Sequence, residues 1–124
     1  MASTYAYTTI AALELFHGGI DYEATFSNYT DSVVEAQITQ AERWVNTFCI
    51  QTFTGSIPDG VVYATLYMSR HFMNVLMLDD GFLEELPRTY EKVVKKCNEA
   101  LKNNKVDIPY TNSIGDYDLR VLRG

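Results

Sequence analysis

The residues of this 124-residue chain that could do chemistry are few and widely spaced. Two histidines, His17 and His71, lie in apolar, helix-like surroundings, and no motif brings either of them to a serine or cysteine nucleophile. The two cysteines, Cys49 and Cys97, have no CxxC or Cys–His spacing of the kind that binds zinc. We therefore expect two buried core thiols, no metal site, no cofactor and no catalytic residue.

The densest acidic cluster, residues 79–85, is the next candidate for chemistry. Its four acids lack the alternating spacing and the turn glycine of a calcium loop, so we expect solvated side chains at helix ends. Gly55 and Gly60 stand alone, which excludes a recognisable phosphate-binding loop. A compact hydrolase or metal enzyme is therefore the least supported of the function classes considered.

Composition and charge favour one globular domain that assembles with other protein. The chain is 47% hydrophobic and 13% aromatic, which is enough to build a core. Residues 1–85 hold eleven acids and two bases, whereas residues 86–124 hold five acids and eight bases, so −9 is followed by +3. The acidic part repels a phosphate backbone, which argues against sequence-specific DNA binding. The charge difference could instead steer subunits together. The alternative is a solvated helix face, which we favour for the lysines from Lys92 to Lys102.

The first 30 residues predict a short helix and a loop. Thr8 and Thr9 can cap an apolar helix that ends at Gly18 and Gly19, and residues 20–29 show no clear period. The start has no positively charged region and carries Glu14 in its apolar run. We therefore expect neither a signal peptide nor a membrane anchor.

A capped amphipathic helix is predicted next. Ser32 and Glu35 have the spacing of a capping box, with Asp31 beside them. Five apolar residues then recur at helical spacing, and polar residues occupy the other faces. The apolar stripe consists of Val34, Ile38, Ala41, Val45 and Phe48, and the polar set of Glu35, Gln37, Gln40, Glu42, Arg43 and Asn46. Trp44 flanks the stripe, where it could close the core or meet a partner.

The segment from Val61 to Leu78 predicts a buried helix that starts near Pro58 and ends at residues 79–81. Of its 18 positions only five are polar: Thr65, Ser69, Arg70, His71 and Asn74. The polar cluster past its midpoint argues against a membrane span. A helix with so little polar surface indicates that neighbouring subunits cover part of it. Its methionines, Met68, Met73 and Met77, are expected to fill gaps in the core, although they could also line a binding groove.

A last helix and an extended arm complete the predicted fold. Pro87 can occupy the first turn of a helix that ends near Asn103. Its apolar face consists of Tyr90, Val93, Val94, Cys97 and Leu101. Near the end, Tyr117, Leu119 and Val121 alternate with Asp118, Arg120 and Leu122, as in a strand or arm that needs a partner. We predict a mainly α fold: a bundle of about four helices in residues 1–105, with an extended or β-like arm in residues 106–124.

The order of these parts resembles a known protein family. A short helix over Tyr7–Phe16 precedes the segment DSVVEAQITQAERWVN, which begins at Asp31 and leads to Thr54 and Gly55. PDGVVYATL then opens the buried helix, and IGDY begins the extended end. In this order the chain resembles the head–tail connector, or head-completion adaptor, proteins of tailed phages. The long segment 20–29 departs from the pattern.

The resemblance implies a structural role in the virion neck, assembled in the host cytoplasm. About twelve copies would form a ring under the portal protein, extend the DNA channel and dock a stopper or tail-completion protein. An acidic lumen would let DNA pass without sticking. Portal docking would map to the extended end: Asp116, Tyr117, Leu119, Arg120, Val121, Leu122 and Arg123.

Aromatic residues are the candidates for packing between subunits. We name Trp44, Tyr63 and Tyr67, because tyrosine and tryptophan tolerate half-burial at interfaces. The alternative function is a small soluble interaction module, such as a regulatory or inhibitor subunit, that binds its partner through the methionine-bearing helix. Such a module would be a monomer or a dimer.

Overall fold

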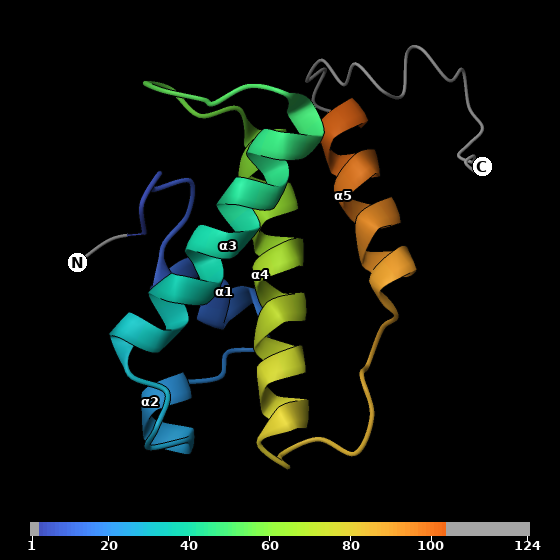
Figure 1. Ribbon diagram of the computed structural model, residues 1–124. Coiled ribbons are helices and arrows are strands. Elements are labelled where there is room, and N and C mark those ends of the chain that lie inside the picture. Colours follow the sequence, from blue (N-terminus) through green and yellow to red (C-terminus); the bar gives the residue numbers. More distant parts are fainter. Residues whose placement is uncertain (1–2, 104–124) are drawn as a thin grey trace.

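The computed structural model describes residues 3–103, and within them the chain is helical and contains no strand. The helices are α1 (Ile10–Phe16), α2 (Tyr22–Thr25), α3 (Asp31–Cys49), α4 (Asp59–Asp79) and α5 (Tyr90–Asn103). Figure 1 shows α4 at the centre, with α3 and α5 on either side and α1 behind. The mainly α prediction is confirmed, whereas the predicted arm, 106–124, lies outside the described residues.

The first helix begins and ends where the sequence predicts. The Thr9 hydroxyl accepts a hydrogen bond of 3.1 Å from the backbone N–H of Ala12, which satisfies one free donor of the helix N-terminus. Gly18 and Gly19 both have φ of +79°, a conformation that glycine adopts without strain. Thr8, the other predicted cap, is buried and lies before the capping position.

The loop predicted for residues 20–29 contains a helix of one turn, α2, so that prediction is wrong for Tyr22–Thr25. Asp21 caps the turn, since its Oδ1 accepts a hydrogen bond of 3.0 Å from the N–H of Ala24. Tyr22 is buried, and its backbone N–H donates to Glu14 Oε2 at 3.0 Å. A single turn is too short to show a helical period, so the sequence pattern could not reveal it.

The helix α3 begins one residue before the predicted cap. Thr30 is the N-cap and makes no side-chain capping bond, whereas Ser32 lies inside the helix and Glu35 is buried. The predicted capping box is therefore wrong, although the helix start is nearly right. At the other end Ile50 takes a left-handed φ of 55°, and its N–H bonds back to the last carbonyls.

Burial on nearly all sides of α4 confirms the prediction of a buried central helix. Even its polar residues Thr65, Ser69, His71 and Asn74 are less than 10% exposed. Thr65 satisfies its hydroxyl within the helix by donating to the Val61 carbonyl at 2.8 Å. This helix is a shared core element that both α3 and α5 contact.

The last helix starts later than predicted. Tyr90 is the first residue of α5, and the Thr89 hydroxyl accepts a hydrogen bond from the Lys92 N–H at 3.3 Å. Pro87 therefore precedes the helix and does not occupy its first turn. The predicted apolar face is present in part: Val93, Cys97 and Leu101 are buried, whereas Tyr90 is 48% exposed.

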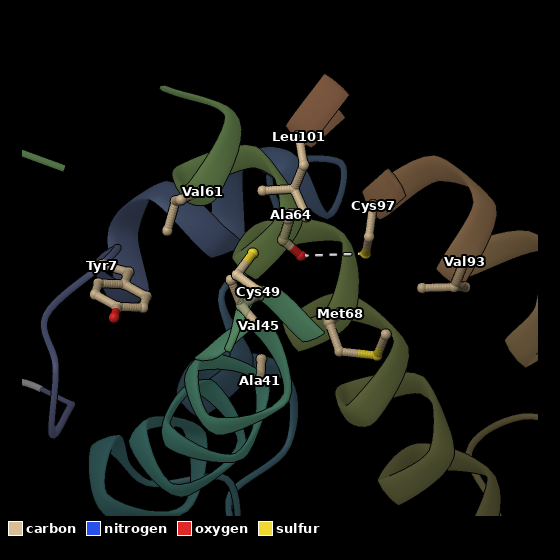
Figure 2. Packing of buried hydrophobic residues seen from close by; sticks show 10 residues of the cluster. All are labelled: Tyr7, Ala41, Val45, Cys49, Val61, Ala64, Met68, Val93, Cys97 and Leu101. Atoms are coloured by element: carbon tan, nitrogen blue, oxygen red, sulfur yellow. Dashed lines mark hydrogen bonds between the residues drawn. The ribbon is translucent and has the colours of Figure 1, made fainter. Parts of the chain in front are cut away.

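The core divides into two clusters along α4. Figure 2 shows the first cluster, in which buried side chains from α3, α4, α5 and the N-terminal segment meet. The Cys97 thiol donates to the Ala64 carbonyl at 3.4 Å, and Cys49 is also buried. The second cluster joins α1 and α2 to α3 and α4, and it includes Leu13, Tyr22 and Met73. The core thus contains both cysteines and the three methionines of α4, as predicted.

Candidate functional site

A stripe on α4 presents aromatic side chains and a positive charge at the surface. Tyr63, Tyr67 and Arg70 are spaced by four and three residues, so they share one face of the helix. Phe16 of α1 packs edge-to-face on Tyr67, with ring centroids 5.0 Å apart. The Arg70 guanidinium carbon lies 4.5 Å from the Phe16 centroid and 5.6 Å from that of Tyr67. We call Phe16, Tyr63, Tyr67 and Arg70 the arginine surface.

Arg70 has no acidic partner among residues 3–103. Burial lowers its pKa, and the nearby positive charge of Arg88 lowers it further. A guanidinium stays protonated in proteins, so within residues 3–103 the two aromatic rings are the groups that hold the cation. Its five N–H donors suit a carboxylate from another chain.

His17 lies beside this surface as a neutral side chain. Its Nδ1 and the Tyr22 hydroxyl form a hydrogen bond of 2.7 Å. Burial lowers the pKa of His17, and the positive charges of Arg70 and Arg88 lower it further. The surface therefore carries its positive charge on arginine at neutral pH.

Trp44 lies in a different aromatic cluster, which joins α3 to α5. Its indole N–H donates to the Tyr90 hydroxyl at 2.8 Å, and its ring stacks on Phe48 with centroids 5.0 Å apart. The His71 ring on α4 lies 5.7 Å from the Tyr90 ring. Trp44 thus contacts side chains of its own subunit and links α3 to α5.

The structure therefore brings together only two of the three predicted packing residues. Tyr63, at 50% exposure, and Tyr67 lie on the arginine surface, whereas Trp44 lies in the cluster with Tyr90. Leu15, next to Phe16 in the sequence of α1, is 77% exposed. The predicted portal-docking residues, 116–123, lie outside the described residues.

Glu42 is a buried residue that the sequence pattern misassigned to a solvated face. Its carboxylate, fully buried on α3, accepts hydrogen bonds from the Ser3 hydroxyl and from the backbone N–H groups of Tyr5 and Tyr7 at 3.0 and 2.9 Å. The exposed position predicted for Glu42 is wrong because residues 3–7 cover it. Only a nonlocal contact decides this, so helical periodicity carries no signal for it.

Tyr7 extends the same attachment one turn further along α3 and to the segment that follows it. Its hydroxyl donates to Asn46 Oδ1 and accepts a hydrogen bond of 2.9 Å from the N–H of Phe53. Burial raises the pKa of Tyr7, so the hydroxyl stays protonated and can donate. The N-terminal segment is therefore held by several buried polar contacts.

The described side chains gather in no group of three acids, histidines or cysteines that could hold a metal ion. None of the helices in residues 3–103 is long and apolar enough to cross a membrane. The four acids of residues 79–85 are exposed, and Asp80 accepts a hydrogen bond of 2.7 Å from the Tyr29 hydroxyl.

No family model, curated protein or solved structure matches this chain. Its function is therefore inferred from its own residues and from the described surfaces.

Proposed function

We propose that this chain is a structural subunit of a tailed-phage virion, a head–tail connector that packs against copies of itself and against the portal protein. The resemblance of its sequence to that family supports the proposal. The described helices follow the order on which the resemblance rests: a short capped helix, a long amphipathic helix and a buried helix opened by Pro58. On this proposal the chain performs no catalysis and binds no organic cofactor.

The observation that carries the proposal is the arginine surface. Tyr63 is half exposed there, and Arg70 is charged but has no ion-pair partner among residues 3–103. A patch with apolar area and an unpaired cation suits a partner surface that is acidic and partly apolar. A second copy has a complementary charge, because residues 1–85 carry −9.

Contact between two different patches is the geometry that builds rings. A heterologous, head-to-tail interface closes into a ring when the rotation between copies divides a full turn. The resemblance implies about twelve copies in a closed ring under the portal. Many acids on the subunit would keep the lumen negative, so that DNA passes without binding.

Portal docking is assigned to residues 116–124 and docking of the stopper or tail-completion protein to loops between helices. Extended segments bind partners by adding main-chain hydrogen bonds and side-chain pockets. The site of action would be the virion neck, after assembly in the host cytoplasm.

The test is the mass of the purified chain in solution, measured by light scattering alone and with portal assemblies from the same source. We expect a ring, or a monomer that joins the portal in about twelve copies. Removing residues 116–124 should abolish portal docking while the helical circular dichroism signal is retained. A stable monomer or dimer that ignores the portal would overturn the proposal.

A matched pair of charge reversals tests the arginine surface itself. Arg70 and Arg43 are the two bases of residues 1–85, and Arg43 is exposed on α3. Arg70→Glu should prevent ring formation, because it places acid against acid, while Arg43→Glu should not. Equal assembly of the two variants would exclude the arginine surface from the interface.

The alternative function, a soluble interaction module, was predicted to bind its partner through the methionine-bearing helix. Met68 and Met73 are fully buried, and Met77 is 6% exposed. The methionine-bearing face of α4 is therefore occupied by the subunit's own core. A soluble partner, if the portal test failed, would be sought at the arginine surface.

A further inference from the structure

A cavity of about 230 Å³ lies where the N-terminal segment meets the starts of α1 and α3. This volume is far above the roughly 15 Å³ that one water molecule needs. The cavity is lined by Ser3, Thr8, Thr9, Ile10, Asp31, Glu35 and Ile38. It can therefore hold an ion together with several of its water molecules.

The charge of the cavity is negative and uncompensated. Asp31 and Glu35 are one helical turn apart on α3, and no lysine, arginine or histidine lines the cavity. Glu35 is only 7% exposed, yet it makes no hydrogen bond or ion pair with any residue from 3 to 103. Two carboxylates one helical turn apart, with no positive side chain beside them, repel each other. This arrangement favours a bound cation.

Thr8 gives an independent indication of a ligand. It is 8% exposed and lines the cavity, and its Oγ1 is buried without a hydrogen-bond partner in the described part of the chain. Buried hydroxyl groups are normally hydrogen-bonded. The neighbouring hydroxyls are already engaged, since Ser3 donates to Glu42 and Thr9 accepts from Ala12.

We propose that this cavity binds a hydrated divalent metal cation, Mg²⁺ or Ca²⁺, through the carboxylates of Asp31 and Glu35 and the hydroxyl of Thr8. Oxygen ligands are those that hard cations prefer, and Mg²⁺ typically uses one or two carboxylates and keeps several waters. Water completes the coordination shell because only two carboxylates line the cavity. The proposal stands independently of the function proposed above.

Metal binding would join the segment before α1 to the first turns of α3. A ligand that binds only the folded chain stabilises it by linkage. The positive end of the α3 dipole weakens cation binding at this position. With two carboxylates, we expect a dissociation constant of about 1 mM, in the range of weak oxygen sites.

The test is thermal unfolding of the full chain after dialysis against a chelator, with and without about 10 mM MgCl₂ or CaCl₂, ten-fold above that constant. The unfolding midpoint should rise by about 5 °C with metal. Glu35→Gln and Asp31→Asn should remove this rise, and Thr8→Val should weaken metal binding in calorimetric titration. KCl at equal ionic strength corrects for general charge screening.

Glu84→Gln is the matched control, because it makes the same chemical change at an exposed acid. This variant should keep the full metal response. The proposal is overturned if neither metal raises the midpoint of the natural chain, or if Glu35→Gln responds as the natural chain does. Should Glu35→Gln not fold, the responses of Asp31→Asn and Thr8→Val decide in the same way.

Discussion

Two segments flank the central part of this fold, and different forces hold them there. The N-terminal segment, residues 3–7, is bound to α3 by polar contacts that converge on the Glu42 carboxylate and the Tyr7 hydroxyl. The helix α5 is bound to α4 chiefly by an apolar face, with Leu101 fully buried. Polar attachment depends on a few exact partners, whereas apolar attachment is spread over many contacts.

This difference has a consequence for local stability. A segment held by one buried carboxylate is released when that acceptor is lost, because its donors remain buried and unpaired. A helix held by an apolar stripe weakens in proportion to the area and the volume removed. We therefore expect substitutions in the two segments to differ in how much stability they remove and in which backbone amides they open to exchange.

Glu42→Ala should have the largest effect. Removing the carboxylate leaves the donors of Ser3, Tyr5 and Tyr7 without their acceptor, and we expect a loss of about 4 kcal/mol in the free energy of unfolding. Urea unfolding measures the loss, and hydrogen exchange should show faster exchange at the amides of Tyr5 and Tyr7. Glu84→Ala, at an exposed acid, should change stability by less than about 0.5 kcal/mol. Equal stability of the two variants would contradict the polar attachment.

Leu101→Ala should have the second largest effect. It leaves a cavity between α5 and α4, which costs about 3 kcal/mol. Hydrogen exchange should show loss of protection in α5 while α3 stays protected, because α5 can open without breaking the Glu42 contacts. Leu15→Ala, at a side chain that is 77% exposed, is the control and should be nearly neutral. Uniform loss of protection in both helices would show that the two attachments are one cooperative unit.

Lowering the pH should have the smallest effect. This experiment compares the α5 side of α4 with its α1 side. Burial holds the pKa of His71, beside Tyr90 of α5, below its usual 6.5, and the pKa of His17 on the α1 side is lowered as well. The unfolded chain therefore takes up protons more readily, so stability is complete above pH 6.5 and falls as the pH drops through the folded pKa.

The measurement is the urea midpoint at pH 7.5 and pH 5.5 for the natural chain, His71→Gln and His17→Gln. Each variant should lose part of the pH dependence. A larger reduction in His71→Gln would place the acid-sensitive contact at α5, and a larger reduction in His17→Gln would place it beside the arginine surface. No change of midpoint with pH in the natural chain would contradict both assignments.

Much of the fold was predictable because helical periodicity is a local signal. The stripe from Val34 to Val45 is buried as predicted, and the breaks at Gly18 and after Asp79 fall where expected. Residue types at the helix ends were less informative about which single residue caps a helix. Thr89 and not Pro87 stands at the start of α5, because capping depends on the local backbone as well as on residue type.

The candidate sites were predictable only in part. Tyr63 and Tyr67 were identified from residue type, and the helix periodicity places them with Arg70 on one face. Phe16 joins them from another helix, and Trp44 turns to Tyr90, which no spacing in the sequence indicates.

The sequence by itself determined the four main helices, their apolar faces and the polarity of the charge along the chain. Each of these follows from residues within a few turns of one another. The tertiary structure alone decided that Glu42 is buried, that α2 forms, and that Asp31, Glu35 and Thr8 line one cavity. The burial of a polar side chain depends on which distant segment covers it and what donors that segment brings, and only the packed chain specifies both.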